Sequence, residues 1–82
     1  MAIALTSETQ HGITIYPDRE AWYRLDRTPG VVNVSPHPEA DHRDLASKDA
    51  ALTANGYTFD GDWQPTAIVG EGHLGFYRTV SK

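Results

Sequence analysis

The residues best suited to chemistry gather in one stretch, His37-Pro38-Glu39-Ala40-Asp41-His42. Two imidazoles and two carboxylates are ligand types that bind zinc and other divalent cations. The spacing argues against such a site, because ligands on one helix stand three or four residues apart, whereas the prolines and a helix predicted to begin at Asp41 send these side chains in different directions. We therefore expect a solvated loop that leads into a helix, with Asp41 as its cap and without a metal ion.

The remaining residues that could act in catalysis have local roles that explain them. His11 and His73 stand beside turn glycines, and no serine lies in the sequence context of a nucleophile elbow. The glycines of Gly70-Glu71-Gly72-His73-Leu74-Gly75 lack the spacing and the following helix of a dinucleotide-binding loop, so they predict a hairpin turn.

Paired carboxylates for acid–base catalysis would be Asp60 with Asp62 or Asp41 with Asp44, which a turn and a helix start explain equally well. The sequence thus predicts neither an enzyme nor a cofactor. A small metal protein or enzyme remains an alternative, and it requires at least two of the four histidines to converge in a pocket.

Charge is distributed unevenly along the chain, which has a formal net charge of -4. Residues 1–36 carry three basic and four acidic side chains, residues 37–72 carry two and seven, and residues 73–82 carry two and none. This distribution disfavours binding to a phosphate backbone and favours a protein partner with a basic surface. The predicted contact set consists of Glu39, Asp41, Asp44, Asp49, Asp60, Asp62 and Glu71.

Aromatic residues beside arginines give a second hypothesis, a nucleic-acid-binding module. It would use exposed tyrosines together with nearby guanidinium groups. The candidates are Tyr16, Tyr23 and Tyr77 with Arg19, Arg24 and Arg78. Trp22 and Trp63 are assigned to the core. Arg78 interrupts an apolar strand face, where we expect its stem to pack and its charged end to reach water.

The elements that must position these residues follow from hydrophobic periodicity and from helix caps. Alternating residues predict strands around Ile3-Ala4-Leu5, at 12–16 and at 31–34, and three more between residues 57 and 80. Helices are predicted from the Asp18 cap through Arg27 and from about 41 to 55, where Asn55-Gly56 supplies the stop. The order β-β-α-β-α-β-β-β predicts a single α+β domain over residues 1–82, with a mostly antiparallel sheet and two helices packed on one face.

The chain has 82 residues and no cysteine, so packing or a second subunit must stabilise it, and a homodimer is compatible with this size. The absence of disulfides favours the cytoplasm. We expect neither secretion nor membrane insertion, because the first residues lack a basic and apolar leader and no apolar run reaches about 18 residues. Together with the charge pattern, these features predict a small noncatalytic regulator or inhibitor, of a kind that mobile genetic elements also use.

Overall fold

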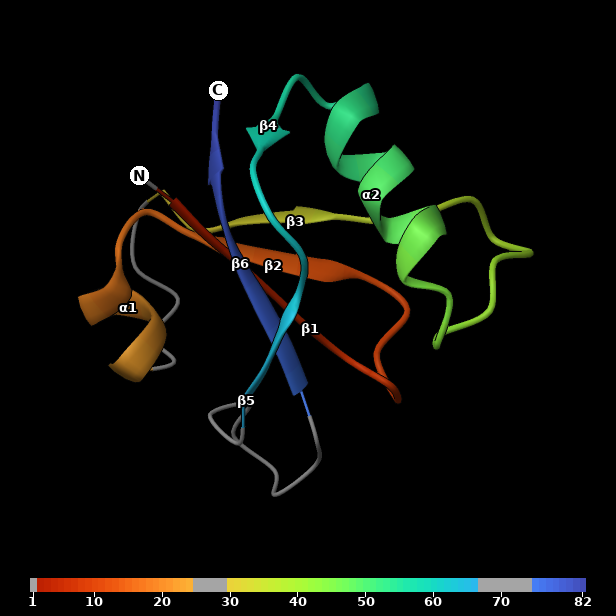
Figure 1. Cartoon of the computed structure of the whole chain (residues 1–82), viewed down its shortest axis with the longest axis horizontal. Helices are drawn as coiled ribbons and strands as arrows, with labels where there is room; N and C mark the ends of the chain where they lie inside the picture. Colours follow the sequence, from red (N-terminus) through yellow and green to blue (C-terminus); the bar gives the residue numbers. More distant parts are fainter. Residues whose placement is uncertain (1, 25–29, 67–74) are drawn as a thin grey trace.

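One antiparallel sheet and two helices make up the part of the chain that the computed structural model describes, residues 2–24, 30–66 and 75–82 (Figure 1). The elements are β1 (Ala2–Ser7), β2 (Ile13–Tyr16), α1 (Arg19–Arg24), β3 (Val32–Val34), α2 (Leu45–Ala54), β4 (Thr58–Phe59), β5 (Gln64–Thr66) and β6 (Gly75–Ser81). The strands follow the order β3-β2-β1-β6-β4, and β5 also pairs with β6. The predicted α+β class and the predicted order of elements are confirmed.

Strand β1 lies at the centre, because it pairs with β2 on one side and β6 on the other. Its side chains alternate between two apolar layers. Ile3 and Leu5 pack in one layer with Trp22 of α1. Ala4 packs in the other layer with Leu52 of α2. The structure therefore differs from the prediction that both helices share one face, because each helix covers a different face of the sheet.

This difference has a physical cause in the composition of β1. A strand whose residues Ile3 to Ser7 are all buried needs cover on both faces. Helix α1, described through Arg24, supplies one bulky buried side chain, Trp22. Helix α2 supplies Ala51 and Leu52 to the other layer. A helix packs against one face of a sheet only, so each of the two faces of β1 is covered by a different helix.

The predicted start of α1 is confirmed, because Oδ1 of Asp18 accepts a hydrogen bond of 2.8 Å from the backbone N–H of Ala21. Glu20 and Arg24 form the ion pair that their i,i+4 spacing predicts. Residues 25–27, the predicted end of this helix, lie outside the described residues.

The predicted start of α2 is wrong by one turn, because its cap is Asp44 rather than Asp41. Oδ1 of Asp44 accepts hydrogen bonds from the backbone N–H groups of Ala46 and Ser47, at 3.0 and 3.3 Å. Oδ1 of Asp41 instead accepts from the N–H of Arg43 at 2.8 Å, which closes a turn before the helix. At the other end, Asn55 caps the helix and Gly56 has a φ of 85°, as the sequence predicts.

Candidate functional site

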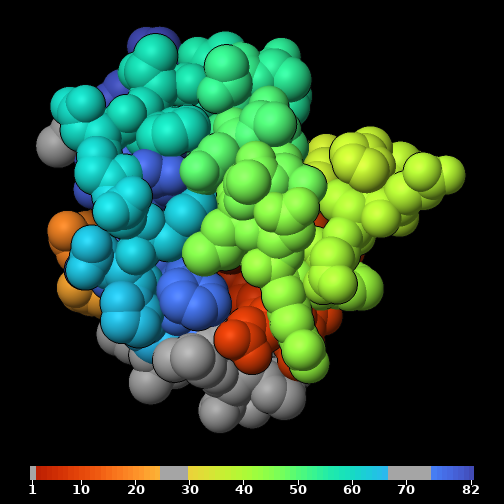
Figure 2. Space-filling model, turned by 45° about the vertical axis from the view of Figure 1, so that its right-hand side comes forward, coloured from red at the N-terminus to blue at the C-terminus, as the bar shows by residue number. Residues whose placement is uncertain are grey.

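The surface around α2 gathers the acidic segments of the chain. Figure 2 shows α2 in the centre, residues 57–66 on one side of it and the projecting loop between β3 and α2 on the other. Of the predicted contact set, four carboxylates are exposed on these segments beside α2, and we call them the acidic surface: Glu39, Asp41, Asp44 and Asp62. Asp60 is also exposed, but its side chain lies with those of Thr58 and Thr79, on the side of β4 away from α2. Glu71 lies outside the described residues. Asp49 is half-buried and bonded within the molecule.

Asp49 binds Arg78, and this pair joins α2 to β6. Nη1 of Arg78 lies 2.6 Å from Oδ1 of Asp49, which also accepts a 2.6 Å hydrogen bond from Nε1 of Trp63. The other guanidinium nitrogen, Nη2, donates to the carbonyl of Gly61, and the guanidinium carbon lies 3.8 Å from the ring centroid of Phe59. The expectation that Arg78 would reach water is wrong, because its side chain is only 4% exposed. Trp22 is buried as predicted, whereas Trp63 lies half-buried at the margin of the core.

Lys48 is a second buried cation, and its burial was not predicted from the sequence. Its ammonium group is fully enclosed and donates to three backbone carbonyls, those of Ser7 at 3.0 Å, Gln10 at 2.9 Å and His42 at 2.7 Å. Burial lowers the pKa of Lys48, and the nearby charge of Asp41 partly offsets this effect. A signal was present in the sequence, because Lys48 stands between Leu45 and Leu52 on the helical stripe that faces the sheet.

The structure brings two of the four histidines together. The rings of His11 and His42 are 5.4 Å apart and nearly perpendicular. The carbonyl of His37 accepts a hydrogen bond of 3.1 Å from Nε2 of His11. His73 lies outside the described residues. Within residues 2–24, 30–66 and 75–82, no three histidine or acidic side chains are grouped to share a metal ion.

An aromatic cluster lies on the opposite face of the sheet, at α1. The ring of Trp22 contacts those of Tyr23 and Tyr77 at centroid distances of 4.9 and 4.8 Å. The guanidinium of Arg19 lies 5.8 Å from the ring centroid of Tyr77. Tyr23 is 55% exposed, while Tyr16 is buried at 7%. Arg78 is remote from this cluster, because its side chain points to the α2 face.

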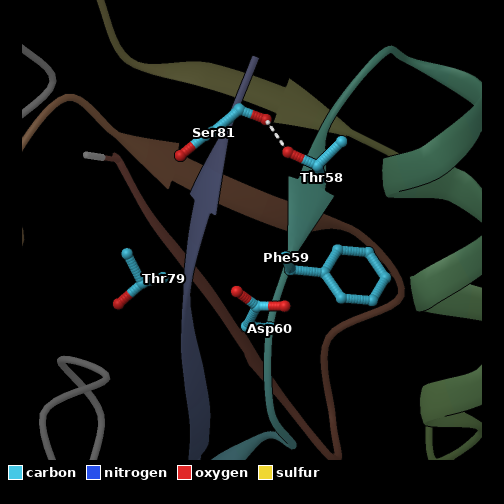
Figure 3. A pocket seen from close by; sticks show the side chains of 5 residues that line it. All are labelled: Thr58, Phe59, Asp60, Thr79 and Ser81. Atoms are coloured by element: carbon cyan, nitrogen blue, oxygen red, sulfur yellow. Dashed lines mark hydrogen bonds between the residues drawn. The ribbon is translucent and has the colours of Figure 1, made fainter.

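A shallow polar pocket of about 270 Å³ lies between β4 and β6 (Figure 3). Asp60 and the hydroxyls of Thr58, Thr79 and Ser81 line it, and Thr58 Oγ1 donates to the carbonyl of Ser81 at 3.4 Å. The ring of Phe59 points away from the other labelled side chains, toward α2 (Figure 3). The described lining of this pocket offers no imidazole or amine to act as a base beside the hydroxyls.

A second hollow of about 480 Å³ separates α2 from the segment that follows β3. Its lining consists of small side chains of α2 together with Ser35, Pro36 and His37. The single imidazole found there belongs to His37, so the described walls of this hollow do not contain a catalytic pair.

Neither of the two described helices is long and apolar enough to cross a membrane. No protein-family model, curated protein or solved structure matches the chain, so the geometry described above carries the functional argument.

Proposed function

We propose that the chain is a noncatalytic binding protein that recognises a basic surface of another protein through the acidic surface around α2. One observation carries this proposal. The cations Lys48 and Arg78, which belong to the elements of this face, are turned inward, whereas the four carboxylates of the acidic surface remain exposed. Arg43 is the exposed basic residue on the loop before α2. The surface therefore presents a strong excess of negative charge.

Such a surface acts by steering and orienting a positively charged partner, and it can inhibit that partner by covering its basic site. This is the role of a small regulator or inhibitor, in line with a chain that lacks catalytic motifs. Because the sequence has no cysteine, we place this role in the reducing cytoplasm. Salt screens exposed charges beyond about 8–10 Å, so binding is expected to weaken as ionic strength rises.

The test is affinity capture from a lysate of the source cell at about 50 and 300 mM salt, followed by titration of the captured partner. The variant Glu39→Lys/Asp62→Lys reverses two charges on the acidic surface. Its control, Glu20→Lys, reverses an exposed charge on α1, which lies on the opposite face of the sheet. We expect at least tenfold weaker partner binding for the first variant and a small effect for the control. Equal binding by both variants contradicts the proposal.

The aromatic cluster at α1 supports a second candidate function, binding of single-stranded nucleic acid. Exposed Tyr23 offers a ring for stacking, and Arg19 beside Tyr77 offers a positive charge. A gel shift at about 50 mM salt tests this function, because nonspecific nucleic-acid binding is strongest at low salt. Retention of a probe by the wild type but not by Tyr23→Ala would favour nucleic-acid binding. If the wild type retains no probe, this candidate function is wrong.

A homodimer is compatible with the first proposal. In the described part of the chain, β3 pairs only with β2, and Val32 on this strand is 44% exposed. An open strand edge can pair with the same edge of a second copy. Light scattering distinguishes a monomer of 9.1 kDa from a dimer.

A further inference from the structure

We infer that His11 and His42 form a binding site for a divalent transition-metal ion, a property separate from the proposed partner recognition. Two imidazoles bound to one tetrahedral ion through metal–nitrogen bonds of about 2.0–2.1 Å have ring centroids about 5 Å apart. The centroids of His11 and His42 are 5.4 Å apart, so both rings already have the separation that a shared ion requires.

The hydrogen bond of His11 prepares this ring as a ligand. A carbonyl oxygen only accepts, so the contact of 3.1 Å between Nε2 of His11 and the carbonyl of His37 places the hydrogen on Nε2. In the neutral imidazole, Nδ1 then carries the free lone pair. A backbone carbonyl that receives the remote N–H of a histidine is the usual outer-shell partner of a metal ligand, because it fixes both the tautomer and the ring orientation.

The His42 ring completes the pair. Its side chain is exposed, and no described residue forms a hydrogen bond with its ring nitrogens. The two rings meet at 83°, edge against face, so one of them must turn to direct its lone pair at the shared ion. Because His11 is held by the carbonyl of His37, His42 is the ring that turns.

Lys48 holds the two backbone segments in place. Its ammonium group binds the carbonyl of His42 at 2.7 Å and that of Gln10, the residue before His11, at 2.9 Å. The turn between β1 and β2 and the loop before α2 are thereby fixed to one buried atom. Binding of an ion between the two rings therefore costs little chain entropy, because Lys48 already holds the two backbone segments together.

The chemistry of the pair sets the class of ion. Imidazoles bind Zn²⁺, Ni²⁺ and Cu²⁺, whereas Mg²⁺ prefers oxygen ligands. Water molecules complete the coordination, since the described residues offer no third histidine or acid in the same group. Protons compete with the metal ion for the ring nitrogens, so binding weakens at acidic pH.

The test measures the melting temperature of the full chain with Ni²⁺, Zn²⁺ or Mg²⁺ at pH about 7.5 and about 5.5, after isothermal titration has given each Kd. With Ni²⁺ tenfold above its Kd, Tm is expected to rise by about 6–11 °C at the higher pH and to return on addition of a chelator. Mg²⁺ is expected to have no effect. The rise is expected to disappear at the lower pH.

Three variants assign the ligands, each compared with its own melting temperature without metal. His11→Asn and His42→Asn are expected to abolish the Ni²⁺-induced rise. His37→Asn is the matched control, because it removes an imidazole from the same loop while keeping the carbonyl that binds His11. Its rise is expected to equal that of the wild type. A wild type that does not respond to Ni²⁺ or Zn²⁺, or a loss in His37→Asn as large as that in His42→Asn, overturns the inference.

Discussion

Arg78 of β6 and Asp49 of α2 form an ion pair that connects the sheet to the helix, with 2.6 Å between Nη1 and Oδ1. The guanidinium lies against Phe59, and the same carboxylate oxygen accepts the indole N–H of Trp63. Nε of Arg78 has no hydrogen-bond partner within the described residues. Because its carboxylate is paired with Nη1, Asp49 provides the negative charge that balances the buried guanidinium of Arg78.

Replacing Asp49 by Ala is expected to lower the free energy of unfolding by about 3 kcal/mol, because the change leaves the buried charge of Arg78 without its partner. Urea denaturation measures this loss. The control is Glu20→Gln, which breaks the exposed ion pair with Arg24 and is expected to change stability by less than about 0.5 kcal/mol. Similar losses in both variants would mean that the Arg78 pair contributes no more than a surface pair.

Lys48 is expected to make stability rise with pH under alkaline conditions. Burial lowers its pKa below the ordinary lysine value of 10.5, so between the lowered value and 10.5 the unfolded chain binds more protons than the folded chain. The free energy of unfolding consequently increases as the pH rises through this window. Urea denaturation between pH about 7 and 10.5 measures the slope.

Lys48→Met removes the titrating group, and its stability is expected to rise less with pH than that of the wild type across the same window. Lys82→Met, at an exposed position, is the control and is expected to keep the slope of the wild type. If Lys48→Met and the wild type had parallel pH profiles, the ammonium of Lys48 would not be desolvated in the folded chain.

Asp44→Ala is expected to lower the melting temperature by roughly 4 °C or more, because three hydrogen bonds at the start of α2 are lost, including one of 2.8 Å from the hydroxyl of Ser47. Asp41→Ala removes one turn contact and is expected to have a clearly smaller effect. Thermal melting followed by circular dichroism compares the two. A larger decrease in melting temperature for Asp41→Ala than for Asp44→Ala would indicate that Asp41 caps α2, as the sequence predicts.

The same Asp44 contacts also give a dependence on acid. Hydrogen bonds from the hydroxyl and backbone of Ser47 lower the pKa of Asp44, so its stabilising contribution is present above the ordinary pKa of an aspartate. This contribution is lost as the pH falls through the lowered value. Melting curves of the wild type and Asp44→Ala are therefore expected to converge at strongly acidic pH.

Gly56→Ala is expected to destabilise the chain by about 1 kcal/mol, because a φ of 85° is costly for a residue with a Cβ atom. The surroundings leave room, since a Cβ at this position meets nothing within 4 Å. Gly56→Asn is the informative control, because asparagine tolerates this backbone conformation better than alanine. If urea denaturation shows that Gly56→Asn is no more stable than Gly56→Ala, the loss of stability does not come from backbone conformation alone.

Several features of the candidate site were predictable because they depend on neighbours in the chain. Asp18 caps α1 through a residue three positions away, and Asn55-Gly56 ends α2 in the same local manner. The exposed carboxylates at Asp60 and Asp62 follow from turn chemistry. The position of the α2 cap was missed because Asp41 and Asp44 have equally good local signals, and the structure uses one for a turn and the other for the helix.

By itself, the sequence determined the order of the strands and helices, the α+β class, most helix ends and the acidity of the middle of the chain, since periodicity, caps and composition act over a few residues. Only the tertiary structure decided which helix covers which face, that Arg78 and Lys48 are buried, and that His42 contacts His11 instead of its neighbour His37. Ser7, whose carbonyl binds Lys48, stands 41 residues from it along the chain, and Asp49 stands 29 residues from Arg78. A charge or an imidazole can be buried or paired only when folding brings such distant carbonyls, carboxylates and rings within a few ångströms, and local patterns do not contain that information.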